Sequence, residues 1–193
     1  NMKMKSVAKN ATVSSTATSD TLIKSFQRSS TLPNDFVATT TNTISLTTSK
    51  VPIYIFFDNT EDAGIMYYYA RDNATIVANS TLSSLFHYMT NLTEVPGLAD
   101  WNTGNVTDMS DMFYSASSLT DISGLANWDT AKVTNMSYMF YSTKITNIDA
   151  LVPNKNNNPN IWNTGNVTNM YQIFGNASSL TDISGLANWD TAK

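Results

Sequence analysis

The sequence contains no cysteine and a single histidine among its 193 residues. Without cysteine there is no disulfide framework and no thiolate ligand for zinc. His87 is the only imidazole, so neither a histidine cluster for a metal nor a cysteine–histidine nucleophile pair is available. No glycine-rich phosphate loop and no acidic calcium-binding loop occurs. We therefore expect no catalytic residues, no cofactor and no metal, and we expect that the protein is not an enzyme.

Charged side chains are also scarce, at 13% of the residues with a net charge of -4. Residues 1–50 are basic on balance and the remainder is acidic, which favours contact between the two parts. The basic residues do not form a cluster, so the sequence does not indicate nucleic-acid binding. No apolar run approaches the roughly 18 residues that span a bilayer, so we expect no membrane span in this segment.

A stretch of seventeen residues, ASSLTDISGLANWDTAK, occurs twice without change, at 116–132 and 177–193. It belongs to a longer repeat marked by four tryptophans spaced by 27, 34 and 27 residues: Trp101, Trp128, Trp162 and Trp189. A fixed period of this length indicates a solenoid of similar units. One unit is too small to bury its apolar side alone, so successive units are expected to share one core.

The repeats occupy residues 82–193. The complete units are 98–124, 125–150 and 151–185, and partial units at 82–97 and 186–193 flank them. The last unit breaks off at Lys193, which predicts that the array continues beyond this sequence. The unit 125–150 is one residue shorter than 98–124, around Lys144 and Ile145. The unit 151–185 carries an eight-residue insertion within VPNKNNNPN (152–160).

The first half of each unit spaces apolar residues by three and four, as Val106, Met109, Met112 and Phe113 do. This spacing predicts one face of a short helix or of 3₁₀ turns. The threonine after each valine is expected to act as a helix N-cap. The methionines and phenylalanines should then form columns through the core, and metal binding by a methionine column is far less favoured than core filling.

The second half of each unit has leucine-rich-repeat spacing, as in Leu119-x-x-Ile122-x-Gly124-x-x-Asn127. The central residues are expected to form a short strand, and the strands of successive units to stack in parallel. The third apolar place is always small, which we attribute to room for the nearby tryptophan. The predicted fold class is an α/β repeat solenoid, leucine-rich-repeat-like, with short parallel strands, short helices or 3₁₀ turns, and a small β-rich N-terminal cap.

The region before the repeats is predicted to provide this cap over residues 46–81. VPIYIFF (51–57) and IMYYYA (65–70) read as a hairpin, and ATIV (74–77) as a further strand. The cap would cover the apolar face of the first unit. Residues 1–45 form an N-terminal arm, with a short helix predicted at 20–29 because Leu22, Ile23 and Phe26 lie on one side.

Side chains on the outer face of the stacked strands are the candidate ligand face. The positions beside the inward isoleucines carry acids, amides and hydroxyls: Glu94, Asp121, Ser123, Asn147, Asp149, Asp182 and Ser184. Such a stripe suits a basic peptide, a cation or sugar hydroxyls, and the alternative is a merely solvated surface. A second candidate is the insertion, because insertions in repeats form exposed loops; its residues are Asn154, Lys155, Asn156, Asn157 and Asn158.

The motif V-T-[DN]-M-x-x-[MI]-F followed by S-S-L-T-D-I-S-G-L-A-N-W-D-T resembles the repeat of the BspA-like leucine-rich-repeat bacterial surface proteins, in the subgroup with repeats of about 26 residues. The resemblance covers residues 46–193, including the segment that precedes the repeats. It implies an extracellular, cell-surface, non-enzymatic protein that takes part in adhesion. It supplies no binding residue.

Two functions are compatible with these observations. The first is an adhesion or protein-interaction module whose strand face recognises a protein or glycan ligand on a host or neighbouring cell. The alternative is a structural protein that self-associates into an extracellular filament or surface coat, since similar units can join head to tail.

Overall fold

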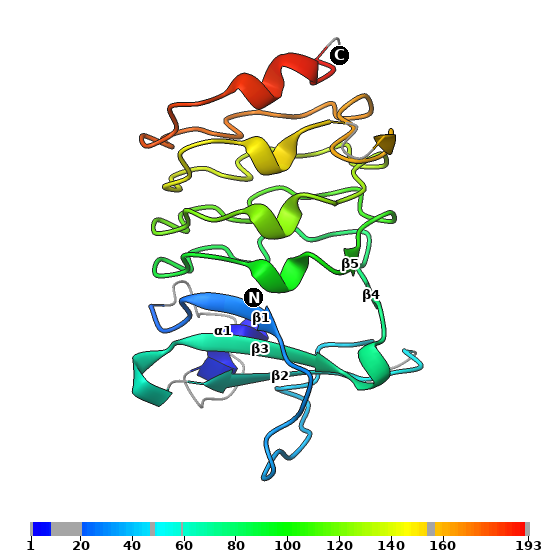
Figure 1. Cartoon of the computed structure of the whole chain (residues 1–193), viewed down its shortest axis with the longest axis vertical. Coiled ribbons are helices and arrows are strands. Elements are labelled where there is room, and N and C mark those ends of the chain that lie inside the picture. The colour runs from blue at the N-terminus through cyan, green and yellow to red at the C-terminus, as the bar shows by residue number, and fades with distance from the viewer. Residues whose placement is uncertain (1, 9–20, 47–48, 59, 154–156, 192–193) are drawn as a thin grey trace.

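The computed structural model describes residues 2–8, 21–46, 49–58, 60–153 and 157–191. In this part of the chain α1 (Met2–Ala8) is the only α-helix, and the other helical elements are short 3₁₀ turns. The strands are short, and two of the three strand pairings are parallel. The architecture is therefore mixed and low in helix, with a small sheet at one end and a stack of similar chain turns above it (Figure 1).

The sheet at the N-terminal end has three strands in the order β1–β3–β2. β2 (Ile53–Asp58) and β3 (Ile65–Ala70) form an antiparallel hairpin at the place predicted for it. The connection contains a 3₁₀ turn, η1 (Thr60–Asp62), and Gly64, whose φ of 62° lies in the left-handed region that glycine adopts without steric cost. A β-carbon at Gly64 would lie 2.6 Å from the Leu22 carbonyl oxygen, so this turn lies directly against the chain leading into β1.

The helix predicted at 20–29 is wrong. Ser25–Arg28 is strand β1, which pairs in parallel with β3 and bridges from Ser25 to Glu94 of the first unit. Phe26 is buried, as its apolar spacing predicted, but it packs on Tyr68 and Phe86. Backbone partners on both sides stabilise the strand, whereas so short a helix gains little from its own hydrogen bonds.

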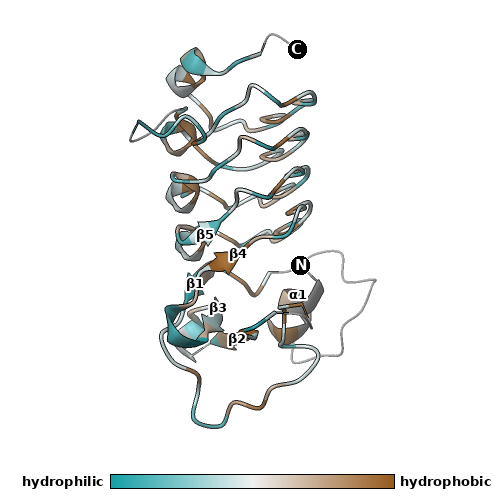
Figure 2. Cartoon of the chain, turned by 90° about the vertical axis from the view of Figure 1, so that its right-hand side faces the viewer, coloured by the Kyte–Doolittle hydropathy of each residue, from teal (hydrophilic) through white to brown (hydrophobic). Residues whose placement is uncertain are grey.

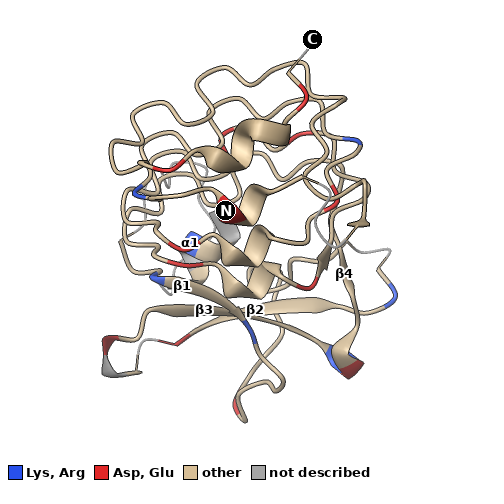
Figure 3. Ribbon diagram, turned by 45° about the horizontal axis from the view of Figure 1, so that its top comes forward, with Lys and Arg blue, Asp and Glu red and all other residues tan. Residues whose placement is uncertain are grey.

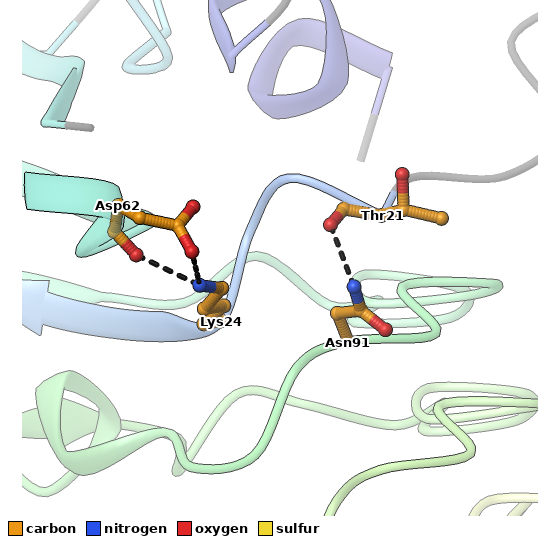
Figure 4. A network of polar contacts seen from close by, with 4 residues as sticks. All are labelled: Thr21, Lys24, Asp62 and Asn91. Atoms are coloured by element: carbon orange, nitrogen blue, oxygen red, sulfur yellow. Dashed lines mark hydrogen bonds and ion pairs between the residues drawn. The ribbon is translucent and has the colours of Figure 1, made fainter.

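A small polar network holds the segment that leads into β1 (Figure 4). The Lys24 ammonium donates to the carboxylate and to the backbone carbonyl of Asp62, both at 2.7 Å. On the other side the Asn91 amide donates to the Thr21 carbonyl over 2.9 Å. The segment is thereby tied to the hairpin and to the first unit, and a basic residue of the N-terminal part meets an acidic one, as the charge distribution predicted.

The N-terminal region meets the stack through two separate strands. The Thr93 N–H donates to the Lys24 carbonyl over 2.8 Å, just before β1. The predicted strand ATIV is present as β4 (Ile76–Val77), but it does not join the hairpin. It pairs in parallel with β5 (Trp101–Asn102) of the first complete unit.

Equivalent residues of successive units are joined by single parallel bridges. One series connects Thr81, Asp108, Asn135 and Asn169, and another connects Glu94 to Asp121 and Asn147 to Asp182. The predicted short strands are thus reduced to one bridging residue each. The 3₁₀ turns that follow are η3 (Pro96–Leu98), η4 (Ser123–Leu125), η5 (Asp149–Leu151) and η7 (Ser184–Asn188).

The first half of each unit is a run of turns, so the helical alternative predicted for it is wrong. Its backbone N–H groups donate to the next unit, as Met109 does to Asn135 and Phe113 to Met139, both at 2.9 Å. Left-handed residues recur in it, among them Asp111 at φ 54° and Ser115 at 55°. A right-handed helix cannot contain these values.

The threonines predicted as N-caps connect units instead. Thr134 donates its N–H and its hydroxyl to the carbonyl of Thr107 in the preceding unit, over 2.9 and 3.2 Å. The residue after the threonine makes the capping type of hydrogen bond instead: the side-chain oxygen of Asn135 accepts the Ser137 N–H over 3.1 Å. Thr107 and Thr168 and the residues after them repeat this arrangement.

The core runs through the stack in columns, and the chain turns follow one another in the same orientation (Figure 2). The phenylalanines stack nearly parallel with ring centroids 5.3 to 5.6 Å apart: Phe86, Phe113, Phe140 and Phe174. Met109 and Met136 are fully buried as well. The predicted core columns are therefore present, although turns rather than helices carry them.

The tryptophans bind the units to one another. The indole N–H groups of Trp128, Trp162 and Trp189 donate to the leucine carbonyl that begins the preceding unit, over 2.8 to 3.0 Å; the acceptors are Leu98, Leu125 and Leu151. Trp101 has the N-terminal sheet before it rather than a complete unit. Its buried Nε1 makes no hydrogen bond of ordinary geometry, although it lies close enough to the Tyr68 hydroxyl to oppose the rise that burial causes in the pKa of that phenol.

The small residue at the third apolar place is required by the backbone of the preceding element. A β-carbon at Gly124 would overlap the carbonyl oxygen of Val95, and one at Gly97 would lie 2.9 Å from the backbone of Gln27 in β1. The explanation predicted from the sequence, room for the tryptophan, is therefore wrong. The shorter unit 125–150 has Ala150 at this place.

We expect Trp128→Phe to destabilise the protein more than Trp101→Phe. Both changes remove similar ring volume, but the first leaves the buried Leu98 carbonyl without its donor, whereas the second removes an N–H that makes no hydrogen bond of ordinary geometry. The free energies of unfolding should differ by about 1–2 kcal/mol, measured by urea denaturation and far-UV circular dichroism. Equal losses would contradict the role of the Trp128 N–H.

We expect Gly124→Ala to lower the free energy of unfolding by about 1–3 kcal/mol, because the new methyl group meets a backbone carbonyl that cannot rotate away. Gly104→Ala is the matched control. Its β-carbon meets side-chain oxygens that can move, of Asp129 at 3.2 Å and of Asn102 at 3.4 Å, so its effect should stay within about 1 kcal/mol. Thermal unfolding of both variants measures the difference, and a wild-type melting temperature for Gly124→Ala would disprove the close approach.

Candidate ligand-binding faces

The structure places the predicted polar face in two bridged segments. Ser25, Glu94 and Asp121 form one, and Asn147 with Asp182 forms the other. We call this set, with the first residues of the following 3₁₀ turns, the polar column. Glu94 is half-buried and the other predicted side chains are exposed: Asp121, Ser123, Asn147, Asp149, Asp182 and Ser184.

Several polar-column side chains hold their own turns. The Oδ1 atoms of Asp121 and Asp182 accept the backbone N–H two residues later, over 2.8 and 2.9 Å, and Asn147 does the same over 3.2 Å. Glu94 accepts the Ser25 hydroxyl over 2.8 Å. Each of these residues therefore supports its own turn or its neighbour, and Asp182 also interacts with the Ser184 hydroxyl. A carboxylate has several acceptor positions, so the aspartates keep capacity to accept hydrogen bonds from a ligand.

The bridges are interrupted between Asp121 and Asn147. In the neighbouring junctions the carbonyls of Thr93 and Thr146 each accept two N–H groups from the following unit, over 3.0 to 3.1 Å. No such hydrogen bond reaches the Thr120 carbonyl in this part of the structure. The shorter unit instead donates from the Lys144 N–H to the Leu119 carbonyl, over 3.0 Å.

An open groove of about 320 Å³ lies at this interruption. Its lining includes polar-column residues from two units and the small side chains beside them: Thr120, Asp121, Ile122, Ser123, Ala126, Asn147, Asp149 and Ala150. Asp121 and Asp149 give the groove an acidic character, and its lining contains no basic side chain. The missing residue of unit 125–150 thus coincides with a hollow along the polar column.

The predicted insertion loop is only partly described. Asn154, Lys155 and Asn156 lie outside the described residues. Asn157 and Asn158 are exposed, and the Asn158 side chain accepts the Asn160 N–H over 3.0 Å. The chain then rejoins the stack through an antiparallel bridge between Asp129 and Ile161.

A second face, which the sequence analysis missed, is formed by aromatic side chains in the turn half of each unit. We call it the aromatic ladder; its members come from four consecutive units and are His87, Tyr88, Tyr114, Tyr138, Tyr141 and Tyr171. Neighbouring ring centroids are 4.3 to 6.0 Å apart. Tyr171 is 60% exposed and Tyr88 36%, and the other members are half-buried.

The ladder has an inner and an outer row. Each ring of the inner row belongs to the residue directly after a core phenylalanine in the sequence. The rings of Tyr114 and Tyr141 stack with their centroids 4.9 Å apart and an angle of 8° between their planes. The outer rings meet their neighbours edge to face, as Tyr138 and Tyr171 do at 81°. Gly175 takes the inner place in unit 151–185, where a β-carbon would lie 2.7 Å from the Tyr141 ring. At that end the Tyr141 ring therefore lies against the backbone of Gly175 instead of another ring.

The electrostatic surroundings keep the ladder largely uncharged. Desolvation, supported by neighbouring tyrosines, raises the pKa of Tyr114 and of Tyr138, so both phenols are protonated at neutral pH. Desolvation also lowers the pKa of His87, which the nearby Asp111 partly offsets. Lys5 of α1 is buried beneath and donates to the His87 carbonyl over 2.9 Å.

A signal for the ladder was present in the sequence. An aromatic residue follows the core phenylalanine at His87, Tyr114 and Tyr141, at intervals of 27 residues. The apolar pattern drew attention to the inward residues only. The sequence analysis made no prediction for the residue after each core phenylalanine.

A larger hollow, of about 680 Å³, lies where the N-terminal region meets the stack. Its lining is mainly apolar and includes Met4, Phe26, Ile53, Ile76, Val77, Leu82 and Trp101. The polar groups in it are hydroxyls and amides such as those of Thr81 and Asn79. Among the described residues that line it, none has an ionisable side chain that could act as an acid or base.

Charged residues lie scattered along a ribbon that is mostly uncharged (Figure 3). Over the described ranges, no group of three or more His, Asp or Glu side chains is placed to hold a metal ion. The same ranges contain no helix with the length and apolar character needed to cross a bilayer.

A family model described as "Mycoplasma protein of unknown function, DUF285" matches residues 80–193, more than half of the chain. The chain belongs to the DUF285 family. The DUF285 region contains the repeat stack, the aromatic ladder and all of the polar column except Ser25, while the three-stranded sheet lies before it. No curated protein and no solved structure matches the chain.

The structural role of Asp182 predicts a pH dependence of stability. The Ser184 N–H and hydroxyl lower the pKa of Asp182 below its ordinary value of 3.8. A carboxyl whose pKa is lowered on folding stabilises the folded state above its unfolded pKa, and this contribution is lost as pH falls through the folded pKa. Asp182→Asn keeps the accepting oxygen but cannot ionise.

We therefore expect Asp182→Asn to lose less free energy of unfolding than the wild type between about pH 5 and pH 2. Urea denaturation at both pH values measures this. Asp35→Asn, at an exposed position of the N-terminal region, is the control and should follow the wild type. An Asp182→Asn variant with the same pH dependence as the wild type would contradict the assignment.

Proposed function

We propose that this chain is the recognition part of an extracellular, cell-surface adhesion protein, and that it is not an enzyme. The stack is, in this proposal, a leucine-rich-repeat-like solenoid of the BspA-like kind. Parallel bridges between equivalent residues, 3₁₀ turns at the same place in successive units and shared core columns support it. Solenoids of this kind commonly bind partners along an extended surface.

The observation that carries the proposal is the polar column with its groove. Its acidic and hydroxyl side chains are exposed and repeat from unit to unit, and the groove beside Asp121 adds a site that the regular repeat does not contain. Asp121 and Asp149 give this place a negative charge without a basic neighbour in its lining. A basic segment of a protein partner is therefore the ligand with complementary charge.

Self-assembly into a filament or coat is the competing function. Parallel head-to-tail stacking would require the last unit of one chain to bridge to the first unit of another. In this structure β1 bridges to Glu94, and β4 pairs with β5. Such stacking would have to displace both strands, so the binding module is the better supported function.

The test compares the wild type with the double variant Asp121→Asn/Asp149→Asn, which removes two charges and keeps the Asp121 turn acceptor. Binding to a panel of immobilised extracellular-matrix proteins is measured by biolayer interferometry at physiological ionic strength. We expect the wild type to bind at least one of them and the double variant to bind it about three- to tenfold more weakly.

Asp35→Asn/Asp72→Asn is the control with the same change in net charge at exposed sites outside the column. It should bind as the wild type does, and the melting temperatures of all three proteins should agree. A wild type that binds no member of the panel, or a groove variant with unchanged affinity, would contradict the proposal.

A further inference from the structure

The aromatic ladder is not needed to fill the core. The phenylalanine column lies beneath it, and Phe86, Phe113 and Phe140 are fully buried. The ladder rings lie outside this column, and Tyr171 exposes 60% of its surface. A contiguous exposed aromatic patch that the core does not use marks a contact surface.

The backbone also does not favour tyrosine at two ladder positions. Tyr88 and Tyr138 have φ values of 57° and 56°, in the left-handed region that suits asparagine and aspartate better than bulky residues. The equivalent left-handed positions of other units hold small or polar residues: Ser84, Asp111, Ser115, Ser142, Gln172 and Asn176. The same turn forms without tyrosine, so the ring and the hydroxyl serve something other than the turn.

The ladder is already ordered before any ligand arrives. Tyr114 contacts rings on several sides, including Tyr88, Tyr138 and Tyr141. These contacts restrict the rotamers of the side chains, so binding would order few of them further. A surface prepared in this way can bind a flexible ligand without a large loss of its own conformational entropy.

The groups that the ladder presents suit an uncharged, hydroxyl-rich ligand. Each phenol can both donate and accept a hydrogen bond. No ladder member is a cation at neutral pH, and Lys5 beneath it is only 1% exposed. Sulfated or phosphorylated ligands would find no exposed guanidinium or ammonium group among its members.

The ring geometry is less suited to a protein partner. Protein interfaces gain most of their energy from side chains that fill desolvated pockets. The inner rings Tyr114 and Tyr141 stack at 4.9 Å, which leaves no space for a side chain to insert between them. What remains accessible is a row of ring edges with hydroxyls, and the exposed ring of Tyr171 at one end.

We propose that the aromatic ladder binds a neutral oligosaccharide whose chain runs along the stack. The Tyr171 ring packs against the C–H face of one sugar, and the hydroxyls of Tyr138 and its neighbours bind hydroxyl groups of the next sugars. Four units spaced by about 4.8 Å give a site about 14 Å long, which fits a short chain rather than a single sugar. This site lies in the other half of each unit from the polar column and does not depend on the function proposed for that column.

The test uses the whole chain and three neutral probes: cellotetraose, maltotetraose and tetra-N-acetylchitotetraose. Isothermal titration calorimetry measures affinity, and shifts of the tyrosine ring signals by nuclear magnetic resonance locate the binding. We expect at least one probe to bind and to shift ladder tyrosines. Tyr171→Ser should weaken this binding at least about tenfold, the loss of one aromatic contact.

Ile183→Ser is the matched control, because Ile183 is 55% exposed in the same unit but lies outside the ladder. It should leave affinity within about twofold of the wild type. A second pair tests the hydroxyls alone: Tyr138→Phe should weaken binding, whereas Tyr69→Phe in β3 should not. Melting temperatures establish that all four variants are folded.

The proposal would be overturned by the absence of binding by all three probes or by unchanged affinity in Tyr171→Ser. Equal or tighter binding of a heparin tetrasaccharide, the anionic comparison, would overturn it as well. A protein ligand that competes for the ladder while no saccharide binds would also overturn it. None of these results affects the polar column, whose own test changes Asp121 and Asp149.

Discussion

Hydrogen bonds between equivalent backbone positions of successive units are the constraint on which the structure depends. Each unit places its carbonyls where the next unit has N–H groups, as Thr107 does for Thr134. Buried threonine hydroxyls extend this bonding, since Thr103, Thr130 and Thr164 donate to carbonyls of the following unit over 2.9 to 3.1 Å. Because buried backbone groups must be paired, the side chains above them have to recur in phase. The phenylalanine column, the polar column and the inner row of the aromatic ladder follow from that phase, whereas Tyr88, Tyr138 and Tyr171 occupy different positions of their units.

The periodicity of the sequence was enough to predict which residues share a column, because the same motif returns in each unit even where one residue is missing or eight are inserted. The sequence also located the hairpin, because β-branched and aromatic residues are concentrated in the two segments that form β2 and β3. It could not predict the local backbone. Spacings of three and four fit a helix and a run of left-handed turns equally well, and only hydrogen bonds to the next unit decide for the turns at Asp111 and Ser115. In the same way, Phe26 lies on a strand because β3 and Glu94 provide partners that are distant in sequence.

The sequence predicted where the polar column lies, but not which hydrogen bonds its side chains make. Asp121 and Asp182 lie in the predicted column, yet one carboxylate oxygen of each accepts a backbone N–H of its own turn. The prediction of regular strands could not show these hydrogen bonds. The aromatic ladder was missed because its rings meet across units: His87, Tyr114 and Tyr141 are separated in sequence and 4.9 to 5.1 Å apart in space. They lie together because the phenylalanines that precede them in sequence are stacked in the same way.

The unit that is one residue short also has a mechanical consequence. On the side of Asp121 one backbone hydrogen bond joins it to the unit before it, from the Lys144 N–H to the Leu119 carbonyl. Its turn half shares five with that unit, donated by Met109, Asp111, Phe113, Ser115 and Thr134. Bending that opens the side of Asp121 therefore breaks fewer bonds here than at the junctions where Thr93 or Thr146 accepts two N–H groups. Under a sideways load the stack has a built-in flexure point, and its axis lies along the bonded turns that carry the tyrosines.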